Sequence, residues 1–186
     1  MKIIKTKFLD LKIIKLKKNK DIRGNLVETF RKKNFNKNNL IFDYKVFSKK
    51  NVIRGFHFQY KHQQAKQIIV LKGKILDCVI DLRKRSKTFG KSFKIFLSEK
   101  NNLSLYVPRG FAHSYLTLDD ENIVYYKLSN YYYPKYESGI MWDDKDLNIN
   151  WPVKKPKISF KDKNLLTYKN FLKKFKHLYL ISFLIS

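Results

Sequence analysis

The chain lacks the features that mark secreted, membrane-spanning and disulfide-stapled proteins. It has one cysteine, Cys78, in 186 residues, so a disulfide framework is excluded and a reducing compartment is expected. No uninterrupted apolar segment follows the N-terminal lysines, which argues against a secretory signal. No run approaches the ~20 apolar residues of a membrane-spanning helix. We therefore expect a cytoplasmic protein with no transmembrane segment.

Acidic residues are also scarce. There are 15 Asp and Glu against 41 Lys and Arg, a formal net charge of +26, and such a charge can reflect nucleic-acid binding. The lysines, however, are scattered along the whole chain between Asn and Ile, which favours a compositional bias of the coding genome. The densest cluster, nine lysines between Lys154 and Lys176, would attract phosphates weakly. No specific nucleic-acid partner is expected.

No internal repeat, low-complexity block or Pro/Gly linker divides the chain. At this length, and with 44% apolar residues, it fits one domain with a sizeable core. Short β-like runs separated by polar turns dominate the middle, which indicates an antiparallel sandwich or barrel. These runs are 66–72 and 74–84 around a turn at Gly73, 92–98 and 103–108 around "EKNN", and 114–118 and 123–133 around "DDEN".

The segment from Asn164 to about Leu180 has a different pattern. Leu165, Tyr168, Leu172 and Phe175 recur at helical spacing with lysines between them, which predicts an amphipathic C-terminal helix packed on the sheet. For the apolar end, "LYLISFLIS", the alternative to packing is a tail that binds a partner or a membrane surface. We expect a single domain over 1–186, with β-structure to about residue 162 and the helix and tail over about 163–186.

The motif "PRGFAH" (108–113) has the form P-x-G-x-x-H, a signature of the cupin jelly roll, in which the His points into the barrel. The partner motif contains H-x-H followed by a Glu. Here His57 is retained, Gln59 replaces the second His, and Lys66 stands where the Glu belongs. An ammonium group cannot ligate a metal. The sequence thus predicts an all-β, cupin-type jelly roll with no metal and no cofactor.

The apolar stretch "NVIRGFHFQY" (51–60) contains Arg54 and His57. A cation and a titratable imidazole inside a β-element are unusual for a strand that serves only the core. A metal-free cupin interior containing His, Lys and Arg suggests proton transfer next to an anionic substrate.

Eight segments spread over nearly the whole chain form a recognisable set of motifs. They are "RGNLVETF" (23–30), "VIRGFHFQ" (52–59), "QAK" (64–66), "LRKRSKTFGK" (82–91), "YVPRGFAHSYLTL" (106–118), "YYKLSNYYYP" (125–134), "ESGIMWDDKDLNINWP" (137–152) and "SFKDKNLL" (159–166). In this order they resemble the motifs of the dTDP-4-dehydrorhamnose 3,5-epimerases. The resemblance implies a homodimeric jelly roll that binds a dTDP-linked 4-keto-6-deoxyhexose and inverts C3 and C5 through enolates.

The resemblance also assigns catalytic roles. His57 matches the base, and an unperturbed imidazole, with a pKa of about 6.5, suits proton transfer at neutral pH. Asp162 matches the carboxylate that orients it, although an ordinary helix N-cap is the alternative. Tyr126 matches the acid on the opposite face, while the residues alone leave Tyr125 open. Lys66 would hold the C4 oxyanion.

The remaining matches are contacts to the substrate. A planar guanidinium suits a diphosphate, and Arg54 and Arg23 match such contacts. One departure is "FDY" (42–44), where family members commonly carry Gln-Asp-Asn. The other expected substrate contacts are Glu28, Gln59, His113, Tyr132, Glu137 and Lys161.

Two alternative functions remain. One is an epimerase that inverts a single centre or acts on another nucleotide-linked 4-keto sugar. The other is a non-catalytic cupin that binds sugar nucleotides or nucleic acid, against which the intact set of four catalytic matches argues.

Overall fold

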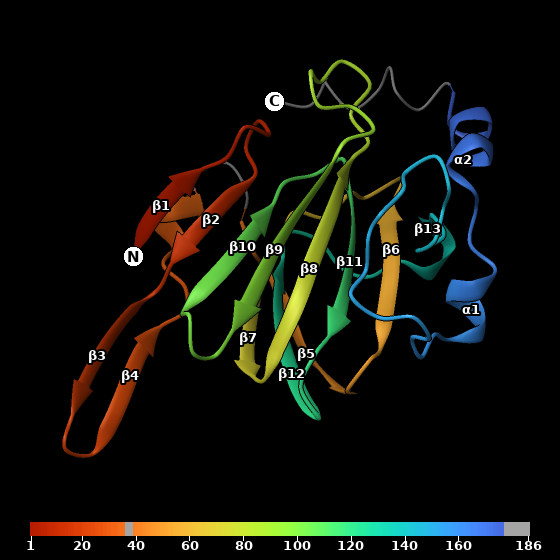
Figure 1. Cartoon of the computed structure of the whole chain (residues 1–186). Coiled ribbons are helices and arrows are strands. Elements are labelled where there is room, and N and C mark those ends of the chain that lie inside the picture. Colours follow the sequence, from red (N-terminus) through yellow and green to blue (C-terminus); the bar gives the residue numbers. More distant parts are fainter. Residues whose placement is uncertain (36–38, 177–186) are drawn as a thin grey trace.

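The computed structural model describes residues 1–35 and 39–176 (Figure 1). Two antiparallel sheets face each other, and short helices lie beside the smaller sheet. The predicted all-β jelly roll with a C-terminal helix is confirmed. The larger sheet contains, in spatial order, β1 (Lys2–Lys5), β2 (Lys12–Lys15), β10 (Leu103–Val107), β7 (Lys66–Lys72), β12 (Glu121–Leu128) and β5 (Phe42–Lys49).

The smaller sheet has five strands, and a two-stranded ribbon stands apart from both sheets. The sheet contains, in order, β13 (Glu137–Gly139), β6 (Ile53–Gln59), β11 (Phe111–Thr117), β8 (Lys74–Asp81) and β9 (Ser92–Ser98). The ribbon pairs β3 (Lys17–Asp21) with β4 (Gly24–Glu28), and the short helices are η1 (Lys32–Phe35), η2 (Pro134–Tyr136), α1 (Phe160–Lys163) and α2 (Tyr168–Lys174).

The turns predicted from the sequence carry the chain from one sheet to the other. β7 and β8, on either side of Gly73, lie in different sheets. Gly73 has a φ of +81°, and an added Cβ would collide with the backbone oxygen of Glu121, so glycine suits this tight crossing. The turns at 99–102 and 119–120 make the same crossing, from β9 to β10 and from β11 to β12.

Alternate residues of these strands build the core between the sheets. Ile68 and Val70 of β7 face Val79 of β8, and the cluster extends to Phe8 and Phe111. Because neighbouring strand residues point to opposite faces, the intervening residues of β8, such as Cys78, pack on the outside of the smaller sheet. There the C-terminal segment covers them.

The C-terminal helix is shorter than predicted. α1 and α2 each begin at a capping hydroxyl, Ser159 and Thr167, and an extended bridge between Ile140 and Leu166 separates them. α2 packs against β6, with the ring of Phe171 5.4 Å from that of Phe58. The predicted apolar tail, 178–186, lies outside the described residues.

The β3–β4 ribbon projects from the body of the molecule, at the lower left of Figure 1. β3 is exposed along its whole length, and the apolar side chains of Ile22 and Leu26 are 103% and 65% exposed. A two-stranded ribbon is marginal when isolated in water, and this one leaves apolar side chains open to solvent. Among the described residues, no helix has the length and apolarity needed to cross a membrane.

Candidate active site

A cavity of about 300 Å³ opens between the two sheets. Its lining comes from β5, β6, β7, β11 and β12 and from the segment that begins α1. The lining residues are Tyr44, Val46, Arg54, His57, Lys66, His113, Tyr115, Tyr126, Ser159, Lys161 and Asp162. Seven of the expected site residues are therefore brought together here.

A β-bulge explains how Arg54 and His57 both face this cavity. Residues three apart in a regular strand point to opposite faces. In the β6–β11 pair, His113 lies opposite His57 and Tyr115 lies opposite Arg54. A stretch of three residues along β6 therefore pairs with a stretch of two along β11. The extra residue restores a common face. Gly55, inside the bulge with a φ of +106°, approaches the His113 backbone too closely for a side chain.

Asp162 joins the C-terminal segment to His57. The carboxylate oxygen Oδ1 lies 2.7 Å from Nε2 of His57, and Oδ2 accepts a 3.2 Å hydrogen bond from the Gly55 amide. Asp162 is not the helix N-cap: Ser159 occupies that position and accepts from the Asp162 amide at 3.1 Å. Burial opposes ionisation of Asp162, but the hydrogen bond from His57 holds the pKa of the carboxyl below its usual value.

Tyr126 faces the cavity, whereas Tyr125 points to the other side of the larger sheet. Tyr126 is 4% exposed, and its ring packs edge-on against His113, 5.9 Å between centroids. Burial, reinforced by the neighbouring phenols of Tyr115 and Tyr44, raises its pKa well above the ordinary value. The Tyr125 hydroxyl instead donates to Asp43. Tyr126 thus holds its proton firmly in the free protein.

Lys66 begins β7 and places its ammonium group in the cavity. Burial lowers its pKa to about 8, and the carboxylates of Glu137 and Asp77 partly oppose that shift. A cation with few fixed counter-charges at hand is available to an incoming anion or a developing oxyanion.

Arg54 and His113 complete the inner wall. The Arg54 guanidinium is exposed and donates from Nε to Oγ of Ser48 at 3.1 Å, leaving its terminal nitrogens for a ligand. His113 is 5% exposed, and its Nε2 lies 2.8 Å from Oδ2 of Asp77. The Asp77 carboxylate is buried on β8, so it fixes the orientation of the His113 ring.

Two further expected residues, Tyr132 and Glu137, form a polar cluster with Lys161 at the edge of the cavity. Tyr132 donates its hydroxyl hydrogen to Oε2 of Glu137 at 2.8 Å, and Lys161 bonds to the same oxygen. Burial opposes ionisation of Glu137, but the bonds from Lys161 and Tyr132 and the nearby His57 lower the pKa of its carboxyl. Tyr132 remains 47% exposed.

Arg23 and Glu28 do not reach the cavity of their own chain. Both belong to the projecting β3–β4 ribbon. Arg23 is bonded to Asp21, and Glu28 to Arg31. The Arg23 side chain is 85% exposed.

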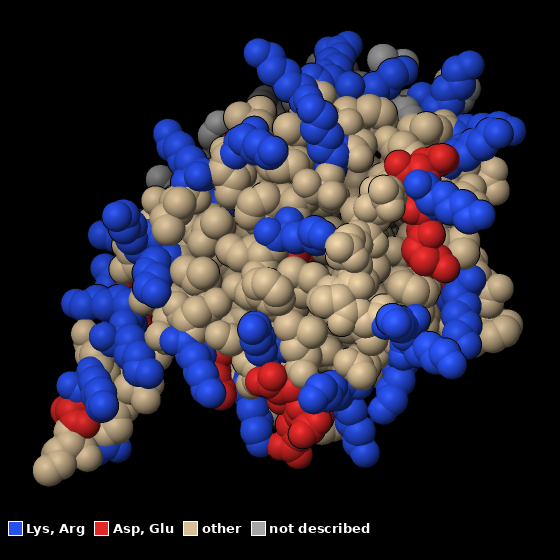
Figure 2. Space-filling model, in the orientation of Figure 1, with Lys and Arg blue, Asp and Glu red and all other residues tan. Residues whose placement is uncertain are grey.

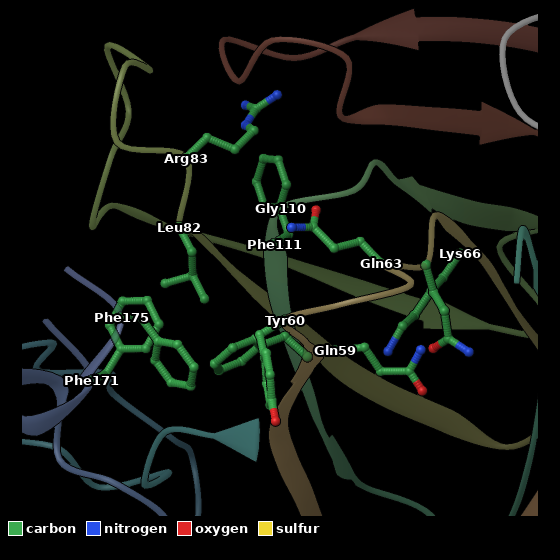
Figure 3. Close-up of a pocket in the computed structure, with 12 residues that line it drawn as sticks. Gln59, Tyr60, Gln63, Lys66, Leu82, Arg83, Gly110, Phe111, Phe171 and Phe175 are labelled. Carbon is green, nitrogen blue, oxygen red and sulfur yellow. The ribbon is translucent and has the colours of Figure 1, made fainter. Parts of the chain in front are cut away.

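Gln59 also differs from its expected place. It is buried, and its side chain holds two loops by donating to the backbone oxygens of His62 and Tyr131 and accepting from the Tyr133 amide. It lines a separate pocket of about 50 Å³, where it lies beside Lys66 (Figure 3). Gln59 therefore positions the 131–133 loop, which explains why β12 ends before the predicted residue 133.

Sequence reasoning missed four residues of the lining: Tyr44, Val46, Tyr115 and Ser159. Strand alternation could have found Tyr115, whereas Tyr44 is identified by the pairing of β5 with β12. Tyr115 follows His113 by two positions in β11, and Tyr44 lies directly opposite Tyr126 in the β5–β12 pair. No group of three or more His, Cys, Asp or Glu side chains with a metal-binding arrangement occurs within 1–35 and 39–176.

A jelly roll with a paired imidazole, a buried phenol and an ammonium group around one cavity defines a cupin-type protein equipped for acid–base chemistry. The family model for dTDP-4-dehydrorhamnose 3,5-epimerase matches residues 5–170. The chain belongs to this family.

Individual members of the family are also similar to this chain. The epimerase of Methanothermobacter thermautotrophicus is 42% identical over 151 residues, covering 77% of this chain and 82% of the relative. The crystal structure of the Bacillus anthracis enzyme with TDP and PPi bound has a TM-score of 0.86 at 39% identity, covering 89% of this chain and 98% of that one. The Legionella pneumophila enzyme, in complex with dTDP-4-keto-L-rhamnose, has a TM-score of 0.86 at 34% identity, covering 89% and 92%.

Proposed function

We propose that this protein inverts C3 and C5 of a dTDP-4-keto-6-deoxyhexose in deoxysugar biosynthesis. The observation that carries the proposal is the convergence of His57, paired with Asp162, and Tyr126 on the same cavity as Lys66. Membership of the epimerase family supports it. So do relatives that hold TDP or a dTDP-linked keto sugar.

The chemistry requires three groups. C3 and C5 flank the C4 ketone, so their protons are acidified, and removal of one gives an enolate. In the proposal, His57 removes the proton and Tyr126 returns one to the opposite face. Lys66 stabilises the enolate oxygen, because a cation placed where charge develops lowers the barrier. His113 and Asp77 shape the wall behind the sugar.

Arg54 and the cluster of Tyr132, Glu137 and Lys161 would receive the nucleotide. The terminal nitrogens of Arg54 suit a diphosphate. The exposed Tyr132 ring would stack on the base, since aromatic rings pack on flat partners. The replacement of amides by Phe42 and Tyr44 leaves these groups in place, and it makes this part of the cavity more aromatic.

We also propose that the active form is a homodimer. Arg23 and Glu28 match substrate contacts in the family, yet they lie on a ribbon that projects away from their own cavity. Two-fold symmetry would let each ribbon reach the cavity of the other subunit. Coverage by a partner would also bury Ile22 and Leu26. A cytoplasmic location is proposed as well, because a single buried cysteine suits a reducing compartment.

Nucleic-acid binding is the rival use of the positive charge. Figure 2 shows Lys and Arg side chains spread over the visible face rather than gathered into one stripe. This distribution supports the compositional interpretation. Non-specific polyanion binding would weaken steeply with salt.

The decisive experiment incubates the protein with dTDP-4-keto-6-deoxyglucose in deuterated water and follows the sugar by NMR. Deuterium at both C3 and C5, with the inverted sugar as product, is the expected result. Exchange and inversion at one carbon would indicate the single-centre alternative. Binding of the nucleotide sugar without exchange would indicate a non-catalytic binder. EDTA treatment belongs in the same series, and activity is expected to survive it.

A further inference from the structure

Two inversions in one binding event create a problem for the acid. Tyr126 gives up its proton at the first centre and must be reprotonated before the second. Its side chain is 4% exposed, so bulk water reaches it poorly while a sugar fills the cavity. A phenolate left at this buried position would also be costly.

Tyr115 stands next to Tyr126 in the same cavity. It belongs to β11, two residues beyond His113 and opposite Arg54 on β6. It is 2% exposed, and its hydroxyl makes no hydrogen bond of normal geometry with the described residues. It nevertheless lies close enough to the hydroxyls of Ser48 and Tyr126 for weak hydrogen-bond contacts, and within electrostatic reach of Arg54. A buried hydroxyl without a well-formed hydrogen bond is costly, and its proton stays available to a neighbouring acceptor.

We propose that Tyr115 relays a proton to Tyr126 between the two inversions, an inference that rests on the proposed epimerase function. When the Tyr126 O–H bond breaks, its proton forms the new C–H bond of the sugar. The Tyr115 O–H bond then breaks, and that proton restores the Tyr126 hydroxyl. The negative charge ends on the Tyr115 oxygen beside the Arg54 guanidinium. Between the two inversions the imidazolium of His57, whose side chain is 26% exposed, returns its proton to water. Tyr115 is reprotonated by water once the product has left the cavity.

The charges around the two phenols support this direction of transfer. Burial raises the pKa of Tyr115, but Arg54, Ser48 and Tyr126 each oppose that rise, Arg54 most strongly. The pKa of Tyr126 is raised by burial and then further by Tyr115 and Tyr44. Negative charge is therefore better placed on Tyr115 than on Tyr126.

Tyr44 is the competing candidate for the relay. Its ring lies 5.0 Å from that of Tyr126, and its side chain is 38% exposed. Burial, with smaller contributions from Tyr115, Glu137 and Tyr132, raises its pKa to about 12, and no cation opposes the rise. A phenolate at Tyr44 lacks the charge partner that Tyr115 has in Arg54.

The test compares Tyr115→Phe with wild type under single-turnover conditions on dTDP-4-keto-6-deoxyglucose, with NMR resolving singly and doubly inverted sugars. We expect the first inversion to proceed near the wild-type rate. The second should slow by about 2- to 12-fold, the change expected from loss of one neutral hydrogen bond, so that the singly inverted sugar accumulates. Tyr44→Phe should keep the wild-type product ratio, and so should Tyr125→Phe, whose hydroxyl lies outside the cavity.

The outcomes separate the relay from the proposed function. An unchanged product ratio in Tyr115→Phe would overturn the relay, and so would accumulation in Tyr44→Phe alone. Equal loss of exchange and of both inversions would also overturn it, because that pattern signals a binding or packing role; dTDP affinity and the melting temperature identify which. A wild-type protein that neither exchanges nor inverts would sink the epimerase proposal and the relay together.

Discussion

The imidazole Nε2 of His57 lies 2.7 Å from the carboxylate of Asp162, although 105 positions separate the two residues. The lowered pKa of Asp162 keeps that carboxylate ionised, and an ionised carboxylate can only accept a hydrogen bond. Nε2 therefore carries the hydrogen, and Nδ1 keeps the lone pair that a base needs. Asp162, in the C-terminal segment, thus selects the tautomer of His57 in the smaller sheet.

Replacing His57 by Asn tests the base. The change retains a polar side chain of similar size but removes the proton acceptor, so wash-in of solvent deuterium at C3 and C5 should fall by about 10²- to 10⁴-fold. The companion Asp162→Asn should fall less, by about 10- to 150-fold, the equivalent of one charge-assisted hydrogen bond. Wild-type exchange in His57→Asn would show that the base is another group.

Replacing Tyr126 by Phe should separate exchange from inversion. The ring still packs beside His113, so the fold should hold. Without an acid on the far face, the enolate can be reprotonated by the imidazolium of His57 on the near face. Deuterium should therefore still enter the sugar while net inversion drops sharply. Tyr125→Phe is the matched control from the same strand, and it should invert normally.

Two results would argue against the role of Tyr126. If exchange and inversion fall together, Tyr126 serves binding or enolate formation. If neither falls, the acid is another group, and Tyr132 is the next phenol to test. NMR of the sugar in deuterated water measures both quantities in one sample.

Lys66 should set the alkaline limit of activity. Its pKa of about 8 means that the ammonium loses its proton as the pH rises through that value, and the neutral amine cannot stabilise an enolate. The pH profile of kcat/KM, which reports the free enzyme, should fall above about pH 8. Lys66→Arg, which stays charged, should be slower but should lack this limb; a limb that persists in Lys66→Arg would belong to another group.

The same shift has a consequence for stability, and its sign can be worked out. The folded-state pKa of Lys66 is below the ordinary value of 10.5. Between about pH 8 and 10.5 the unfolded chain therefore binds more protons at this residue than the folded one, so its contribution to the free energy of unfolding rises with pH. Below that window the cost of burying the charge is fully present. Urea titrations of wild type and Lys66→Met across this range would measure the difference.

The extent to which the site was predictable differed from residue to residue. The motif around residues 108–113 and the resemblance indicated His57, Lys66 and His113, and the structure brings all three to one cavity. The shared face of Arg54 and His57 depends on a bulge, which neither periodicity nor composition signals. Gln59 lies in β6, as its motif predicts, but its side-chain amide is bonded to the backbone of two loops. Tyr115 lies two positions beyond the end of the 108–113 motif, so no signature marks it, although strand alternation places it on the same face as His113.

The ends of the strands were predictable from the sequence, whereas their pairing into sheets was not. Polar turns at 72–74 and 99–102 predicted where strands stop, since turn residues act locally. Which strands pair is decided by burial across the whole chain, so the turns themselves did not reveal that they are crossings between the two sheets. The ribbon of β3 and β4 was not predicted. β3 is lysine-rich and exposed on both faces, and β4 is a five-residue strand that starts with the polar pair Gly24 and Asn25, so neither has an alternating apolar pattern to reveal it.

Subunit mixing would test whether Arg23 acts in the partner's cavity. Arg23→Ala should lower kcat/KM by about 10- to 150-fold through loss of a charge-assisted bond to the diphosphate, whereas His57→Asn is inactive within its own cavity. In a mixed dimer, a ribbon that crosses to the partner leaves one cavity with both defects and one with neither. Random reassociation at equal amounts should then make about a quarter of all cavities intact. Activity of the mixture at low substrate should exceed the sum of the two parents. A mixture that merely averages the parents, while native mass spectrometry shows that mixed dimers have formed, would mean that Arg23 serves its own subunit or none.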